Sequence, residues 1–222
     1  MLTNLDLIGR VPLFSMLNAS QTESLAGAVD KRRFKRGEFI VEQGKKGESL
    51  FIILAGRARV VVTDRRDREV ILATLHPGDY VGEMSLIDHE PASATVEAEI
   101  QTDVLVLGGE DFNRCLQENI ATVSAVMKGL VHRLRSADRK IESLALMNVY
   151  GRVANVLLDS APPDADNIRI IRDKISRQDI AKMVGASREM VSRVMKDFEE
   201  QGFIEVRDDG SLVIKERRLQ TR

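Results

Sequence analysis

Short β-prone runs separated by glycine-containing turns fill much of the first half of the chain. Before them, residues 1–30 predict one or two short helices, at Leu13–Leu17 and Gln21–Val29, with Ser20 as an N-cap. The predicted strands are Phe39–Val41, Leu50–Leu54, Arg59–Val62, Val70–Leu75, Thr95–Ala98 and Val104–Leu107. Many short strands at intervals of roughly 8–12 residues are typical of a small antiparallel barrel or roll.

A heptad repeat of apolar residues follows. Its positions step alternately by three and four residues, and they are Ile120, Val123, Met127, Leu130, Leu134, Ala137, Ile141 and Leu144. A 3.5-residue repeat sustained over more than three heptads is typical of a helix that packs against a second copy of itself. We therefore predict a dimerisation helix over residues 118–147, with Val123 to Leu144 of this row as the dimer interface. The alternative is a long amphipathic helix that packs on its own domain.

The pattern changes again after residue 147. The predicted elements are a hinge at Asn148–Gly151, a helix at Arg152–Leu158, a loop at 162–166 and a short strand at Ile168–Ile171.

Residues 176–195 have the pattern of a helix-turn-helix. Ser176 and Asp179 form the Ser-x-x-Asp start of a first helix. Gly185 suits a turn that needs a left-handed backbone, and Ser187 can cap the second helix. Ala181 is small where the two helices must approach closely, and Val191, Val194 and Met195 give the second helix one buried face.

The outward side chains of the second helix suit a DNA major groove. An arginine can donate two hydrogen bonds to guanine, and a glutamate can accept from the amino group of cytosine. An acid facing a polyanion is costly unless it reads a base, so Glu189 is especially informative. The residues expected at DNA are Gln178, Ser187, Arg188, Glu189, Ser192, Arg193 and Lys196, the last as a phosphate contact. A hairpin over Gly202–Ile214, with its turn at Asp208-Asp209-Gly210, predicts a wing.

Length and composition narrow the class of protein. With 222 residues, 43% of them hydrophobic and 30% charged, the chain has room for about two globular domains. No apolar run approaches the ~20 residues of a membrane span. Residues Met1–Arg10 lack a basic start followed by a long apolar core, so we expect no signal peptide. The single cysteine, Cys115, cannot form an internal disulfide or hold an iron–sulfur cluster. We therefore expect a cytoplasmic protein that does not contact a membrane.

Basic residues gather in the C-terminal part of the chain. Residues 169–222 carry 13 Lys and Arg against 10 Asp and Glu, whereas residues 1–168 carry 20 against 24. This asymmetry indicates an anionic partner for the C-terminal segment, in agreement with the helix-turn-helix.

The histidines and the motif content of the sequence do not indicate an enzyme. Its three histidines, His76, His89 and His132, are not at metal-ligand spacing, and it has neither a phosphate-loop lysine motif nor a nucleophile elbow. We expect no enzyme activity, no metal site and no covalently bound cofactor. A haem sensor that uses His76 as a ligand is an alternative that an absorbance spectrum tests.

The chain resembles the CRP/FNR family of bacterial transcription regulators over nearly its full length. The stretch Ser187-Arg188-Glu189-x-x-Ser192-Arg193 is similar to the family's recognition helix. The resemblance implies an α+β fold with a β-roll sensor domain (1–117), the dimerisation helix (118–147) and a winged helix-turn-helix domain (148–222). It also implies a homodimer that reads a palindrome of TGTGA-like half-sites through Arg188, Glu189 and Arg193, with RNA polymerase as a further partner.

Residues Pro77–Leu86, followed by Pro91–Ala94, resemble the family's phosphate-binding cassette. The resemblance implies that Glu83 accepts from a ribose 2′-hydroxyl and that Ser93 contacts phosphate. Backbone N–H groups from Gly82 onward, at the start of a short helix, suit an anion. The residues expected at a ligand are Gly82, Glu83, Met84, Ser85, Ala92, Ser93, Ala94, Arg133, Arg135 and Asp138.

The sequence departs from the cyclic-AMP binders of the family. Ala92 stands where they carry a phosphate-binding arginine, and Ala137-Asp138 replaces the threonine–serine pair that contacts adenine. Arg133 keeps the position of a helix arginine near the ligand. Arg135-Ser-Ala-Asp138 matches the Arg-x-x-Asp pattern of cyclic di-GMP sites. Cyclic di-GMP is therefore favoured over cyclic AMP as the effector, and a ligand-independent regulator controlled by its abundance is the alternative.

Overall fold

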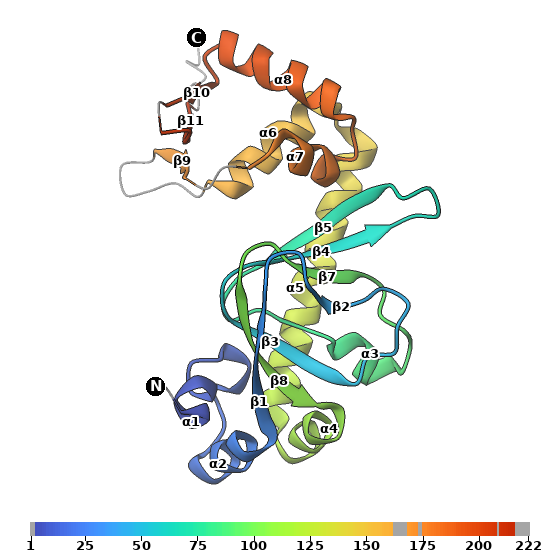
Figure 1. The fold of residues 1–222 in the computed structure, drawn as a ribbon, viewed down its shortest axis with the longest axis vertical. Coiled ribbons are helices and arrows are strands. Elements are labelled where there is room, and N and C mark those ends of the chain that lie inside the picture. Colours follow the sequence, from blue (N-terminus) through green and yellow to red (C-terminus); the bar gives the residue numbers. More distant parts are fainter. Residues whose placement is uncertain (1–2, 162–167, 173–174, 208, 216–222) are drawn as a thin grey trace. The chain divides into compact units, whose positions relative to one another are not determined.

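The structure, a computed structural model, describes residues 3–161, 168–172, 175–207 and 209–215 (Figure 1). The chain divides into two compact units, Met1–Leu134 and Arg135–Arg222. The domain boundaries inferred from the sequence remain predictions. Within the described residues, no helix is both long enough and apolar enough to span a membrane.

Two four-stranded antiparallel sheets form the roll of the first unit. Their strand orders are β1-β8-β3-β6 and β2-β7-β4-β5. The strands are β1 (Val29–Phe34), β2 (Phe39–Val41), β3 (Ser49–Ala55), β4 (Ala58–Thr63), β5 (Glu69–Leu75), β6 (Tyr80–Val81), β7 (Thr95–Ala98) and β8 (Thr102–Gly108). Each predicted strand is present within two residues of its expected ends, and the predicted roll is confirmed.

The paired strands β3 and β8 separate two hydrophobic cores. They are antiparallel, with Leu50 opposite Leu107 and Ile53 opposite Val104. Because side chains alternate along a strand, Leu50 and Leu107 enter one core, whereas Ile53 and Val104 enter the other. The first core is shared with the helices of this unit, and the second lies between residues of the two sheets. Burial on both faces explains why these strands are almost continuously apolar.

Two strands were not predicted. β1 (Val29–Phe34) has the sequence VDKRRF, in which charged residues replace the alternation expected of a half-buried strand. It lies at the edge of its sheet with its middle side chains exposed, where that composition is tolerated. β6 (Tyr80–Val81) has two residues, too few for any pattern to reveal.

The N-terminal helices differ in detail from the prediction. They are α1 (Asn4–Ile8), a 3₁₀ turn η1 (Pro12–Phe14) where Leu13–Leu17 was expected, and α2 (Ala19–Ala28) where Gln21–Val29 was expected. Ser20 as the N-cap was wrong. Asn18 takes this role, because its side chain accepts from the Gln21 N–H at 2.9 Å while the Gln21 side chain accepts from the Asn18 N–H at 3.0 Å. This reciprocal capping box begins the helix earlier.

The predicted long helix is present as α5 (Ile120–Leu146), after α3 (Glu83–Asp88) and α4 (Gly109–Glu118). Thr122 and Val126 are buried on the side of α5 that faces its own unit. Gly129 lies on the same side, so close to Tyr80 that a β-carbon on it would overlap the phenol hydroxyl. The rest of α5 within this unit faces other directions, which leaves most of the heptad row uncovered.

The second unit contains three helices and a small antiparallel sheet. Its helices after the end of α5 are α6 (Val149–Ser160), α7 (Arg177–Val184) and α8 (Arg188–Glu200), and its strands are β9 (Arg169–Ile171), β10 (Ile204–Val206) and β11 (Leu212–Ile214). The sheet order is β10-β11-β9. Val153 and Leu157 of α6, Ile180 of α7, and Val191 and Val194 of α8 are fully buried in one core. The α+β fold class is confirmed.

The hinge expected at Asn148–Gly151 was misplaced. The Asn148 side chain accepts from the Gly151 N–H at 3.0 Å and caps α6, so Tyr150 and Gly151 are already helical. The break between α5 and α6 therefore lies at residues 147 and 148. The predicted loop at 162–166 is outside the described residues, and the strand expected at Ile168–Ile171 is present as β9.

Candidate functional site

The helix-turn-helix has the geometry that its sequence predicts. Ser176 accepts from the Asp179 N–H at 3.0 Å and begins α7. Gly185 ends that helix with φ of +64°, a left-handed conformation that costs glycine little. Ser187 accepts from the Met190 N–H at 3.2 Å and begins α8. Two caps and one glycine thus fix where both helices start and how they are joined.

The two faces of α8 differ sharply in chemistry. Val191, Val194 and Met195 are buried, as predicted, and Phe198 continues this face. The opposite face exposes Arg188, Glu189, Arg193 and Lys196, with Ser187 exposed at the cap, Gln178 exposed on α7 and Ser192 half-buried. Arg188, Glu189, Ser192, Arg193 and Lys196 therefore share one face of α8, whereas Gln178 is exposed on the preceding helix. A buried apolar stripe with a polar, solvent-facing row is the arrangement that lets a helix enter a groove.

Glu189 lies at the start of α8. Hydrogen bonds from its own backbone N–H and from the Ser187 hydroxyl hold the pKa of the Glu189 carboxyl below its usual value. The residue is thus an ionised acceptor on the exposed face, suited to an amino group on a base edge. Lys196 lies 3.5 Å from Glu200 in an exposed pair, an interaction that solvent weakens and that phosphate could replace.

One contact on α8 was not found from the sequence. The Tyr150 hydroxyl on α6 donates to the Asp197 carboxylate on α8. The Tyr150 ring also meets Phe198 edge to face, with centroids 6.0 Å apart. Tyr150 and Asp197 are separated by 47 residues in the sequence. A pairing over that separation leaves no local pattern, so only the fold reveals it.

A second constellation lies in the first unit, where β6 leads into α3. Gly82 has φ of +97°, and a β-carbon there would overlap the Ser49 carbonyl, so the position requires glycine. Glu83 follows and is 1% exposed. Arg133 of α5 donates to Glu83 Oε1 at 2.7 Å and to the Tyr80 carbonyl, and its guanidinium lies 4.9 Å from the centre of the Tyr80 ring. The residues Tyr80, Glu83 and Arg133 thus join the roll to α5.

The Glu83 carboxylate is incompletely satisfied. Burial raises the pKa of Glu83, and the neighbouring Arg133 charge opposes that rise. Oε1 accepts from Arg133, whereas Oε2 is buried without a hydrogen-bond partner. Buried carboxylate oxygens without donors are uncommon in folded proteins. Oε2 is therefore a buried acceptor without a donor, which is chemically suited to a hydroxyl group.

The other expected ligand residues lie in two places. The Ala92 backbone pairs with Gly44 and Lys45, its side chain is buried, and Ser93 beside it is exposed. On α3, Met84 is exposed and Ser85 is buried, and Ala94 is buried after Ser93. Arg135 and Asp138 are exposed residues of α5 that belong to the second unit. They share one helix face, because residues three apart do, whereas Arg133 and Arg135 point to different sides.

Comparison with known proteins agrees with both halves of this description. Residues 31–119 match a family model described as a cyclic nucleotide-binding domain, and residues 151–221 match one described as a Crp-like helix-turn-helix domain. The cAMP-activated global transcriptional regulator Vfr of Pseudomonas aeruginosa is 34% identical over 204 residues, which cover 88% of this chain and 94% of Vfr. The cAMP-activated regulator CRP of Salmonella typhimurium is 34% identical over 171 residues, 74% of this chain and 80% of CRP.

A solved structure shows the same fold. The c-di-GMP responsive global regulator CLP of Xanthomonas campestris superposes with a TM-score of 0.75 at 23% identity, over 90% of this chain and 100% of that one. The chain therefore belongs to the CRP/FNR family: it is a DNA-binding transcription regulator with a domain of the cyclic nucleotide-binding type, and it is not an enzyme.

Proposed function

We propose that this regulator is a homodimer that reads a palindrome of TGTGA-like half-sites and is switched by a nucleotide second messenger. The observation that carries the DNA part is the exposed row of α8, in which Arg188, Glu189 and Arg193 face solvent while the other side of the helix is buried. Two-fold symmetric half-sites require two linked copies of that helix. RNA polymerase is the proposed further partner.

The support for a homodimer is the heptad row on α5. Met127, Leu134 and Ile141 are each exposed by more than 60% in the single chain. Large apolar side chains in a continuous row on one helix face are unusual on a free surface and suit a matching row on a second copy. Leu130 also packs against the roll core, so the same helix contacts both its own unit and the proposed partner.

The support for a nucleotide effector is the buried Glu83 carboxylate. Its Oε2 atom has no donor, and Arg133 extends from α5 to the other oxygen. A ribose hydroxyl on Oε2 would satisfy the carboxylate and add a bond beside the contact between roll and helix. A ligand can shift the protein only by its differential affinity for two states. A ligand at Glu83 would lie beside the contact that Arg133 makes with the roll, and could change the free energy of that contact.

We rank cyclic di-GMP ahead of cyclic AMP. Ala92 is buried and uncharged, so it cannot pair with a cyclic phosphate as an arginine would. The structurally similar CLP is described as responsive to c-di-GMP. Arg135 and Asp138 provide donors and an acceptor for a guanine edge on one face of α5. Cyclic AMP is the second candidate, because Vfr and CRP are named as cAMP-activated.

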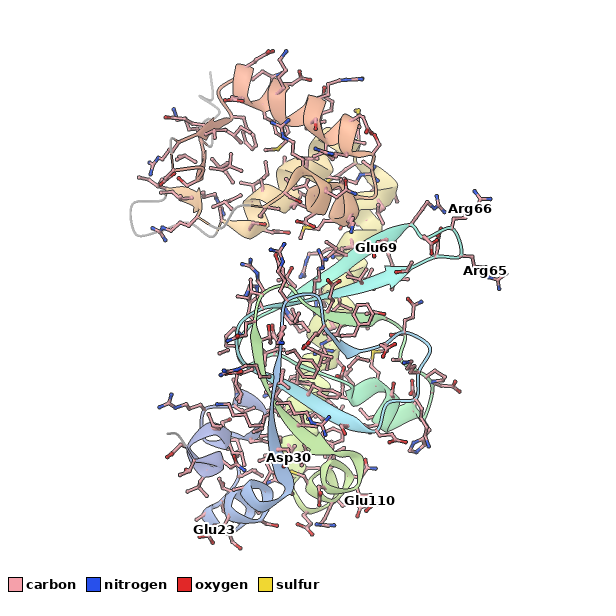
Figure 2. All side chains as sticks on the ribbon, in the orientation of Figure 1. Glu23, Asp30, Arg65, Arg66, Glu69 and Glu110 are labelled. Carbon is pink, nitrogen blue, oxygen red and sulfur yellow. The ribbon has the colours of Figure 1, made fainter. Side chains whose placement is uncertain are left out.

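Calorimetry with cyclic di-GMP, cyclic AMP and cyclic GMP tests the effector, with DNA affinity measured in parallel. We expect one nucleotide to release heat and to change affinity for the palindrome. Glu83→Gln should weaken that binding, whereas Glu110→Gln, which alters an exposed carboxylate on α4 (Figure 2), should not. No heat and unchanged DNA affinity with all three nucleotides would favour the ligand-independent regulator.

A further inference from the structure

Three charged residues follow one another along the exposed side of α8. Glu189, Arg193 and Asp197 are four residues apart, so they share one row of the helix. Arg193 is exposed, and Asp197 is half-buried. Within the described part of the chain, neither carboxylate forms an ion pair with Arg193. Arg193 thus has a possible ion-pair partner one turn away on each side.

Tyr150 binds one of these two carboxylates, that of Asp197. It lies in the first turn of α6, just after the Asn148 cap, and its hydroxyl donates to Asp197 Oδ2. Its ring is held edge to face against Phe198, with an interplanar angle of 74°. Phe198 is buried and meets Phe203 at 4.9 Å. The phenol is therefore fixed by aromatic packing, and its hydroxyl directs the Asp197 carboxylate toward α6.

Electrostatic interactions also connect Tyr150, Asp197 and Arg193. The hydrogen bond to Asp197 is the main cause of a raised pKa for the Tyr150 phenol, and the nearby positive charge of Arg193 opposes it. Arg193 therefore interacts electrostatically with the Tyr150–Asp197 pair but forms no hydrogen bond with either residue in the described structure. If the hydroxyl were absent, Asp197 would be free to turn toward Arg193, one helical turn before it.

We propose that Tyr150 is a positioning residue for DNA recognition: by holding Asp197, it leaves Arg193 free to reach a base. The inference rests on the proposed function, in which Arg193 reads the half-site. A free carboxylate one turn away competes with DNA for the guanidinium and repels nearby phosphates. An exposed ion pair of this spacing changes an equilibrium by about twofold, so a dimer with two such sites should lose about two- to fivefold in affinity.

A double-mutant cycle on the full-length chain tests this role. Fluorescence anisotropy would measure affinity for a TGTGA palindrome and for a scrambled duplex of the same composition. We expect Tyr150→Phe to bind the palindrome about two- to fivefold more weakly, with a smaller change on scrambled DNA. Asp197→Ala should bind as tightly as the wild type or more tightly, and Tyr150→Phe/Asp197→Ala should match Asp197→Ala. Glu199→Ala, which removes an exposed carboxylate of α8, is the matched control and should not rescue Tyr150→Phe.

A purely structural tie between α6 and α8 gives a different result. Asp197→Ala would then weaken binding as much as Tyr150→Phe, and the double variant would not recover, which would overturn the inference. Equal affinity of Tyr150→Phe and wild type would overturn it as well. A wild type that does not distinguish the palindrome from the scrambled duplex would overturn the proposed function, and this inference with it. Thermal unfolding of each variant shows that the compared proteins are folded.

Discussion

Glu83 is a carboxylic acid that the roll removes almost wholly from water. Because its pKa is raised in the folded protein, the folded state binds a proton here more readily than the unfolded chain. Glu83 therefore favours folding at low pH, and this contribution is lost as pH rises through its folded pKa. Glu83→Gln should raise the free energy of unfolding relative to the wild type at neutral pH, and the gain should vanish near pH ~4. Urea unfolding at several pH values measures it, and a difference that does not change with pH would contradict this account.

Arg188 is the residue that should define base preference most directly. It is exposed in the first turn of α8, where a guanidinium can donate two bonds to guanine. Arg188→Ala should cost about 1–3 kcal/mol per half-site and relax the preference at one base pair. Lys196→Ala is the comparison, since loss of a phosphate contact should weaken all sequences alike and reduce the salt dependence. Binding of the palindrome by Arg188→Ala with wild-type affinity and selectivity would show that this assignment is wrong.

At the scale of the element, Gly129 marks a close approach between α5 and the roll. Replacing a glycine by alanine inside a helix normally stabilises by about 1 kcal/mol. Gly129→Ala should instead destabilise by about 1–3 kcal/mol, because the new methyl group overlaps the Tyr80 hydroxyl. The double variant Gly129→Ala/Tyr80→Phe, which lacks that hydroxyl, should recover part of the lost stability. Gly27→Ala in α2, where nothing lies within 4 Å of a new β-carbon, is the control that should not destabilise. Denaturant unfolding compares the four proteins.

Elements differ in how well local sequence determines them. The long heptad row made α5 predictable, and Ser176, Gly185 and Ser187 determined the helix-turn-helix through bonds within a few residues. Edge strand β1 was missed because its charged sequence carries no alternation. Side-chain contacts such as Arg133 with Glu83, which span 50 residues, depend on the assembled roll. Their residue types could be recognised, but their geometry could not.

The hairpin of β4 and β5 also contains a backbone conformation that the sequence alone does not predict. Its strands were predicted, but its turn places Asp67 at φ of +56°, a conformation that glycine adopts more easily. Arg65 and Arg66 extend from this turn (Figure 2). Asp64 accepts from the Arg66 and Arg68 backbone N–H groups at 2.8 and 3.1 Å. Those bonds explain how a non-glycine residue is held there.

At the scale of the whole molecule, the proposed dimer depends on the exposed row of α5. Leu134→Asp would place a carboxylate in the middle of that row, where burial without a partner is costly. The variant should dissociate at micromolar concentration, and affinity for the palindrome should fall with it, because two linked recognition helices are needed. His132→Asp adds the same charge at an exposed α5 position outside the row, and should remain dimeric. Light scattering that finds a monomeric wild type would contradict the proposed assembly.

The aromatic composition has a practical consequence. The chain contains two tyrosines and no tryptophan. Tyr80 stacks with Arg133 beside Glu83, and Tyr150 binds Asp197 on α8. Apart from the weak emission of phenylalanine, ultraviolet fluorescence of this protein therefore comes from these two rings. Tyr150→Phe leaves an emitter at the proposed effector site, and Tyr80→Phe leaves one beside the proposed recognition helix, so each event can be followed optically without attaching a dye.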